Sequence, residues 1–112
     1  MIKVSFTQEG NKLSLRLEGH ADYAEEGKDI VCASASILAY TVAQRILELE
    51  AYKILSVPPT VKMESGDAVI EAVCDGEIAI AEVMRVMHFA KIGCSLLQAS
   101  YPEHIKFIVI EA

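Results

Sequence analysis

The chain has few cysteines, and no two of them lie at CxxC spacing. Its three cysteines, Cys32, Cys74 and Cys94, are an odd number and are far apart in the sequence. This argues against a disulfide framework and against a zinc knuckle, so we expect reduced thiols. His88 and His104 belong to no arrangement of Cys, Asp or Glu at metal-ligand spacing. We therefore expect neither a metal ion nor another cofactor.

Basic residues are also scarce. Ten Lys and Arg face sixteen Asp and Glu, and the formal net charge is −6. Affinity for nucleic acid depends on clustered Lys and Arg that neutralise phosphates, so direct binding of nucleic acid is disfavoured. An acidic surface of this kind suits a basic protein partner better.

Targeting and membrane signals are missing as well. No segment has the basic-then-apolar order of a signal peptide, because Met1 leads directly into an alternating pattern. The longest uncharged run, Ile30 to Gln44, is fifteen residues long and contains several hydroxyl side chains. Such a run is too short and too polar to span a bilayer. We expect a cytoplasmic protein with no membrane partner.

Apolar residues are plentiful, at 53% of 112 residues, so the chain has ample material for one core. Residues 2–7 and 13–17 alternate apolar and polar side chains around a turn at Gly10, as in a β-hairpin. From Ile30 the pattern is helical until Pro58 and Pro59. Because its first half is uniformly apolar, we expect this helix to be central and well covered.

The second half of the chain repeats this outline without a shared motif. Residues 61–65 and 68–74 predict a second hairpin around Gly66. A second helix is expected from Glu77 to near Ser100, and a last strand over residues 105–110. The apolar face of that helix is predicted to consist of Ile78, Val83, Val86, Met87, Ala90 and Leu97. The order ββαββαβ predicts an α+β two-layer domain over residues 1–112, with two long helices on a mostly antiparallel, mixed sheet.

One segment departs from ordinary packing patterns, and it contains His20, Asp29 and Cys32. If Asp29 is the N-cap of the first helix, Cys32 lies in the first turn, beside unpaired backbone N–H groups that favour a thiolate. Lowering a thiol pKa from about 8.5 to about 7 takes roughly 2 kcal/mol, whereas a helix terminus supplies about 0.3 to 1. A neighbouring cation is needed, and His20 is the nearest candidate.

These residue types also have ordinary structural roles. A free cysteine is often a small buried hydrophobic residue, and a histidine beside a glycine is often a loop residue. The residues alone therefore leave both a catalytic and a structural interpretation open. Cys74 and Cys94 are expected to be core thiols without chemistry, and His88 and His104 to lie on a helix surface and in a turn.

The stretch Gly19-His20-Ala21, followed by Gly27, Asp29, Cys32 and Ser36, resembles the signature of the ribosomal-processing (Prp) cysteine proteases, including the spacing of twelve residues from His20 to Cys32. The resemblance implies an endopeptidase with Cys32 as nucleophile and His20 as general base. Its substrate would be bacterial large-subunit ribosomal protein twenty-seven, from which it would remove a short N-terminal extension after a hydrophobic, aromatic-ending motif. It also implies a homodimer.

The resemblance further implies that the loop between the two catalytic residues moves when substrate binds. In this chain the loop is residues 21–28, with Ala21, Asp22, Tyr23 and Gly27. Its carboxylates would steer a basic substrate inward at low salt, or would simply be solvated. Gly27 is either a hinge or a turn residue.

Two supporting residues keep alternative roles. Asp29 either orients His20 or caps the helix by accepting from the Cys32 amide, and we favour the cap. Ser36 lies one turn after Cys32, where its hydroxyl would touch nucleophile or substrate, or where a small side chain permits close packing. Backbone N–H groups at the helix start, including that of Cys32, are the expected oxyanion donors.

Two other functions fit the same residues. A thiol peroxidase also places a reactive cysteine at a helix N-terminus, and Cys74 or Cys94 would then resolve the sulfenic acid. A non-catalytic ribosome-assembly adaptor would bind a hydrophobic peptide at a sheet edge without cleaving it.

Overall fold

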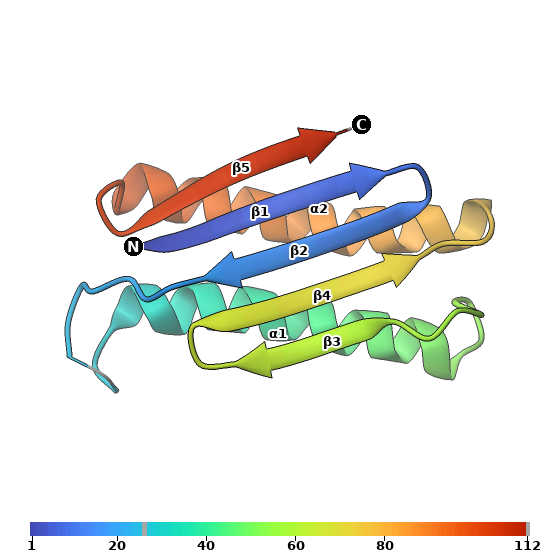
Figure 1. Cartoon of the computed structure of the whole chain (residues 1–112), viewed down its shortest axis with the longest axis horizontal. Helices are drawn as coiled ribbons and strands as arrows, with labels where there is room; N and C mark the ends of the chain where they lie inside the picture. Colours follow the sequence, from blue (N-terminus) through green and yellow to red (C-terminus); the bar gives the residue numbers. More distant parts are fainter. Residues whose placement is uncertain (26, 112) are drawn as a thin grey trace.

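Five strands and two helices follow one another in the predicted order ββαββαβ (Figure 1). The computed structural model describes residues 1–25 and 27–111. The elements are β1 (Ile2–Glu9), β2 (Lys12–Glu18), α1 (Ile30–Ala51), β3 (Thr60–Glu64), β4 (Asp67–Val73), α2 (Glu77–Ser100) and β5 (Ile105–Glu111). Both hairpins and both long helices are present as the sequence predicts, although the first helix is shorter than expected.

The strands form one open sheet in the order β3-β4-β2-β1-β5. Neighbouring strands are antiparallel except β1 and β5, which are parallel, so the sheet is mixed as predicted. Both helices cover the same face of the sheet (Figure 1). Glu18 at the end of β2 pairs with Asp67 at the start of β4. Because of this register, the residues that follow β2 lie beside the turn between β3 and β4.

The core lies between the sheet and the two helices. Alternate residues are buried along β2 and along β1 as far as Phe6, as the period of two predicts. The buried residues of α1 are Val31, Ala35, Ala39, Val42, Ala43, Ile46 and Leu49, and those of α2 are Ala79, Val83, Val86, Met87, Ala90 and Cys94. The small alanines let both helices lie close to the sheet.

The helix α1 ends earlier than expected, at Ala51 instead of near Pro58. Lys53 takes a left-handed conformation, with φ of 62°. The N–H groups of Ile54 and Leu55 then both donate to the Leu49 carbonyl, at 2.8 and 3.1 Å. This C-terminal motif stops the helix before the prolines and folds Leu55 back into the core, where it is buried.

The outer faces of both helices are less covered than expected. Ile37 and Tyr40 on α1 are exposed, and so is Ile78 on α2, which the sequence placed on the apolar face. Two helices on one face of a sheet bury only the sides that face the sheet and each other. The expectation of a well-covered α1 is therefore wrong.

By length and composition, α1 meets the criterion for a membrane-spanning helix, contrary to the expectation from the sequence. Its most apolar window of 18 residues has a mean hydropathy of 1.5, and 33% of that window is buried. Core helices of soluble proteins meet the same criterion, and seven residues of α1 pack against the rest of the molecule.

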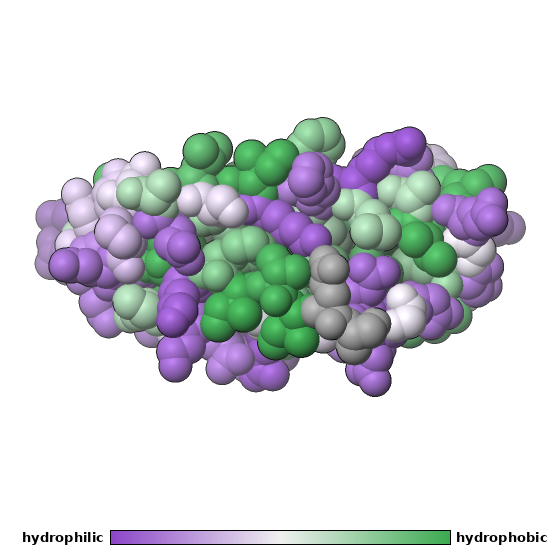
Figure 2. All heavy atoms as spheres, turned by 90° about the horizontal axis from the view of Figure 1, so that it is seen from above, coloured by the Kyte–Doolittle hydropathy of each residue, from purple (hydrophilic) through white to green (hydrophobic). Residues whose placement is uncertain are grey.

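The edge strand β5 also exposes apolar side chains. Ile108, Val109 and Ile110 are all exposed. Seen from the side on which β5 and α2 lie, apolar side chains gather near the middle of the molecule (Figure 2). An apolar edge strand is a surface that favours pairing with another chain.

Candidate active site

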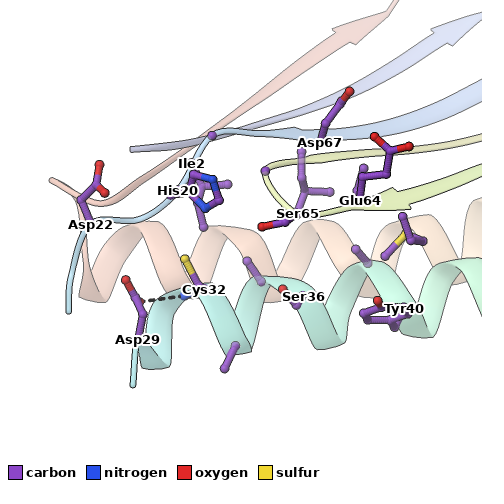
Figure 3. Close-up of a pocket in the computed structure, with 18 of the residues that line it drawn as sticks. Ile2, His20, Asp22, Asp29, Cys32, Ser36, Tyr40, Glu64, Ser65 and Asp67 are labelled. Carbon is purple, nitrogen blue, oxygen red and sulfur yellow. Dashed lines mark hydrogen bonds between the residues drawn. The ribbon is translucent and has the colours of Figure 1, made fainter. Parts of the chain in front are cut away.

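Three elements converge at one end of the molecule, namely the end of β2, the start of α1 and the β3–β4 turn (Figure 1). Between them lies a groove of about 710 Å³. Its lining includes His20, Cys32, Ser36, Tyr40, Met63 and Gly66 (Figure 3). The groove follows α1 from Cys32 toward Tyr40, so it has room for an extended peptide beside the sulfur.

Cys32 lies in the first turn of α1 and is half-buried. Its side chain points toward the end of β2, where His20 lies (Figure 3). The backbone N–H of Ala21 donates to Cys32 Sγ at 3.3 Å. The sulfur therefore lines the groove and accepts a hydrogen bond from the loop that follows β2.

Asp29 is the N-cap of α1, so the structure supports the capping interpretation. Its Oδ1 accepts from the amides of Val31 and Cys32, at 3.0 and 2.9 Å. Its Oδ2 accepts from the amides of Tyr23 and Ala24, at 2.9 and 3.2 Å. Within residues 1–25 and 27–111 no hydrogen bond joins Asp29 to His20. The carboxylate thus ties the loop to the start of the helix that bears Cys32.

These contacts lower the pKa of Asp29 below its usual value of 3.8. Burial of the carboxylate raises the pKa, but the four backbone N–H donors together outweigh it, with the Cys32 amide the strongest. The Cys32 amide is therefore occupied by the cap. This conflicts with the expectation that it serves as an oxyanion donor.

His20 lies two residues after the end of β2 and against the β3–β4 turn. The Gly19 N–H donates to the Gly66 carbonyl at 2.9 Å, which joins the two segments. Gly66 has φ of +74°, and a Cβ added to it would lie 2.7 Å from His20 Nε2. Only glycine allows the imidazole to lie this close to the turn.

The structure brings His20 and Cys32 to the same groove but does not join them. No hydrogen bond between them is present among the residues described. Ser36 lies one turn after Cys32 and lines the same groove. The four predicted site residues His20, Asp29, Cys32 and Ser36 therefore lie together, with Asp29 at the cap.

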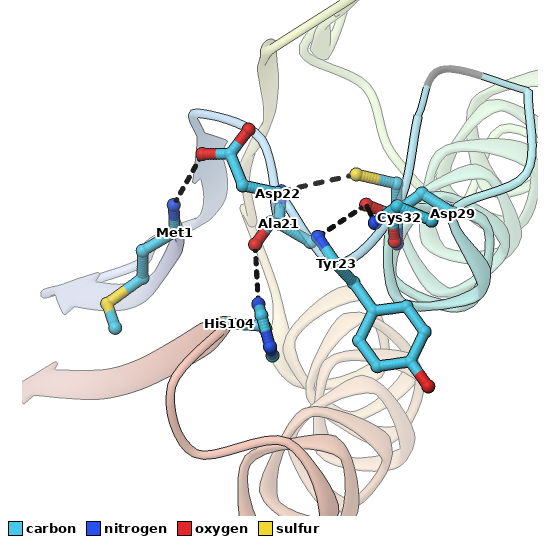
Figure 4. Close-up of polar contacts among 8 residues, drawn as sticks. Met1, Ala21, Asp22, Tyr23, Asp29, Cys32 and His104 are labelled. Carbon is cyan, nitrogen blue, oxygen red and sulfur yellow. Dashed lines mark hydrogen bonds and ion pairs between the residues drawn. The ribbon is translucent and has the colours of Figure 1, made fainter.

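The first half of the loop between His20 and Cys32 is anchored. Ala21 is buried, and Asp29 holds the next amides in place. Asp22 has φ of 55° and its carboxylate lies 3.5 Å from the N-terminal ammonium group (Figure 4). Gly27 has φ of +85° with open space around it, as in a turn. Residues 21–24 are therefore tied to the core, to Asp29 and to the N-terminus.

Two parts of the site were not expected from the sequence, the Gly66 turn and His104. His104 Nδ1 donates to the Ala21 carbonyl at 2.8 Å (Figure 4). Its ring and that of Tyr101 each meet the Tyr23 ring edge-on, with centroids 5.3 Å apart. His104 does lie in a turn, as expected, but 83 residues separate it from its partner, and no local pattern signals such a contact.

The other two cysteines are core residues, as expected. Cys74 and Cys94 are each 1% exposed and free. Burial raises the pKa of both thiols, that of Cys94 to about 11. Buried protonated thiols are poor resolving groups for a sulfenic acid, which argues against a thiol peroxidase. No cluster of three metal-ligating side chains is found among residues 1–25 and 27–111.

Comparison with known families identifies the class of protein. The sequence model of the family described as cysteine protease Prp matches residues 1–106, which places the chain among the cysteine proteases. More narrowly, the chain belongs to the Prp family. No curated protein matches it.

Solved structures share its fold. An essential ribosomal processing protease Prp from S. aureus, in complex with a covalently linked product peptide, is 25% identical with a TM-score of 0.77, over 97% of this chain and 99% of that one. The same S. aureus protease in complex with a substrate peptide is 24% identical with a TM-score of 0.72, and the match covers 97% of this chain and 99% of that one. A Streptococcus mutans protein, SMU.848, is 24% identical with a TM-score of 0.72, and the match covers 100% of this chain and 96% of that one.

Proposed function

We propose that this protein is an endopeptidase in which Cys32 is the nucleophile and His20 the general base. One observation carries the proposal: the sulfur at the start of α1 points toward the strand end that bears the imidazole, and both lie on one open groove. The amide of Ala21 already donates to this sulfur, and the thiolate is the form that gains most from such a contact.

The reaction follows from this placement. His20 takes the proton of Cys32, and the thiolate attacks the scissile carbonyl to form the C–S bond. The tetrahedral intermediate then collapses, and His20 protonates the departing amine. Water, deprotonated by the same imidazole, hydrolyses the thioester and releases the acid product. The mechanism requires the His20 imidazole to come within hydrogen-bond distance of Cys32 Sγ, and both side chains line the groove in which this would happen.

The proposed substrate is the N-terminal extension of large-subunit ribosomal protein twenty-seven, in the cytoplasm. Support comes from the S. aureus relative, which is a ribosomal processing protease with a peptide in its structure. Asp22, Glu64 and Asp67 line the groove, but Asp22 is paired with the N-terminal ammonium group and the other two with Lys62. The electrostatic support for a basic partner is therefore the net charge of −6 of the whole chain. The apolar side chains of Leu17, Tyr40 and Met63 in the same groove suit a hydrophobic cleavage motif.

The test uses the full chain and the unprocessed ribosomal protein as substrate. We expect one cut, read by mass spectrometry as a single new N-terminus, and no cut with Cys32→Ala. An intact precursor after prolonged incubation with the parent protein would refute processing of this partner. Peptide binding without cleavage by either protein would support a non-catalytic adaptor instead.

We also propose that the protein is a homodimer that pairs through the outer face of α1 and α2. Ile37, Tyr40 and Phe89 are exposed there around a second hollow. Arg45 and Glu82 form an ion pair at 3.2 Å beside them, so the face offers both signs of charge to an identical copy. Sedimentation equilibrium should give twice the chain mass of 12.2 kDa. A single-chain mass at all concentrations contradicts the proposal.

A further inference from the structure

The sulfur of Cys32 accepts a hydrogen bond from the backbone of Ala21, and a histidine far along the sequence binds the same residue. The donor is Ala21 N–H, at 3.3 Å from Sγ. Ala21 is 1% exposed, and its carbonyl accepts from His104 Nδ1 at 2.8 Å. The two polar groups of this one residue therefore connect Cys32 at the start of α1 with His104 in the turn before β5 (Figure 4).

Most other amides around the sulfur have partners already. Val31 and Cys32 donate to the Asp29 carboxylate, and Ala33 donates to the Asp29 carbonyl at 3.0 Å. Gly19 donates to the Gly66 carbonyl. Among these amides, that of Ala21 alone is directed at the reacting atom.

We propose that the Ala21 amide is a catalytic donor and that His104 is the positioning residue that aims it. The inference rests on the proposed function, because it needs Cys32 as nucleophile. In the resting enzyme the N–H donates to Sγ at 3.3 Å. When the C–S bond forms, the π electron pair of the carbonyl moves onto its oxygen, which is bonded to the carbon that Sγ attacks. The same N–H then donates to this oxyanion. As the C–N bond breaks, the electron pair returns and the amine leaves with the proton held by His20.

His104 suits this positioning role because three segments fix it. Its N–H donates to the Tyr101 carbonyl at 2.9 Å, and its carbonyl accepts from the Ile2 N–H at 2.9 Å. Its ring meets Tyr23 edge-on, on the same loop that bears Ala21. The backbone of His104 is therefore fixed and one side of its ring is packed, so the Nδ1–H stays directed at the Ala21 carbonyl.

The experiment compares His104→Ala and His104→Asn with the control His88→Ala. His88 lies exposed on α2 and outside the groove. In Asn the amide nitrogen occupies nearly the place of Nδ1, so this variant keeps the donor and loses the ring. The readouts are kcat and KM on the precursor peptide, and the pH profile of Cys32 alkylation by iodoacetamide, which needs no substrate.

For His104→Ala we expect kcat to fall by about 10- to 100-fold with KM within about twofold, less than the loss of a whole oxyanion donor. The midpoint of its alkylation profile should move to higher pH, because the thiolate loses a well-aimed donor. His104→Asn should recover most of both effects. A kcat equal to that of the control, a change confined to KM, or failure of Asn to rescue would each overturn the proposal.

Two further outcomes remain separable. If the parent protein cleaves no peptide, the proposed protease activity is refuted. An alkylation profile of His104→Ala that matches the parent's would refute the proposed role of the contact between the Ala21 amide and the sulfur, whatever the result for cleavage. If His104→Ala does not fold, as judged by circular dichroism, Tyr23→Leu replaces it. This variant keeps the backbone amide on Asp29 and removes only the ring beside His104. A kcat and alkylation profile equal to the parent's would then overturn the proposal.

Discussion

Replacing Cys32 by Ser should reduce turnover of the precursor peptide by about 10³- to 10⁴-fold or more, while peptide affinity stays within about twofold. The hydroxyl of serine is far less acidic than a thiol, so His20 cannot generate a comparable nucleophile. The groove proposed to bind the peptide is otherwise unchanged. Single-turnover cleavage read by mass and binding read by fluorescence anisotropy measure the two quantities. Comparable cleavage by parent and variant would disprove the nucleophile assignment.

Residues that act as a unit do not contribute additively to catalysis. The turnover of His20→Ala should therefore be nearly as low as that of Cys32→Ser. The turnover of the double variant should be only slightly lower than that of either single variant. Additive losses would show that the two side chains act independently. Because His20 is exposed, its replacement should leave the free energy of unfolding nearly unchanged.

A milder probe of the same pair uses the β3–β4 turn. In Gly66→Ala the new methyl group would lie 2.7 Å from His20 Nε2, so the imidazole must move. Gly10→Ala is the matched control, because Gly10 has φ of +60° but nothing within 4 Å of an added Cβ. Both variants should lose similar stability through backbone strain, about 1 kcal/mol or more. Only Gly66→Ala should also lose activity.

The fold could be predicted because its signals are local. Alternation with a period of two gives β1 and β2, and the turn at Gly66 lies between β3 and β4 as expected. What failed depends on packing between distant elements. Ile78 fits an apolar pattern but lies on the uncovered side of α2, and the end of α1 is set by the left-handed Lys53, not by the prolines.

The candidate site divides in the same way. His20, Asp29 and Cys32 lie within thirteen residues, so a cap and a strand end suffice to place them together. Gly66 and His104 join the site only through the pairing of β2 with β4 and of β1 with β5. Strand order cannot be derived from the period of single strands, and both contacts were missed for that reason.

Asp29 gives the largest expected effect on stability, since its carboxylate holds four backbone amides. Asp29→Ala should lose about 1 kcal/mol for the helix cap, which is the acceptor of the Val31 and Cys32 amides, and about 1 to 3 kcal/mol more for the part-buried amides of Tyr23 and Ala24. Asp29→Asn separates the two roles. Its oxygen still caps Val31 and Cys32, while its NH₂ group faces the N–H donors of Tyr23 and Ala24. Urea titration should therefore give the highest free energy of unfolding for the parent, a lower one for Asp29→Asn and the lowest for Asp29→Ala.

The same carboxylate predicts how stability depends on pH. The folded pKa of Asp29 lies below 3.8, because its backbone hydrogen bonds outweigh burial. The contribution is therefore complete above the unfolded value near 3.8 and is lost as the pH falls through the folded pKa. The stability difference between parent and Asp29→Ala should stay constant from neutral pH to about pH 5 and shrink in more acidic solution. A difference that does not change down to pH 2 would mean that the aspartate stabilises the loop and helix without being charged.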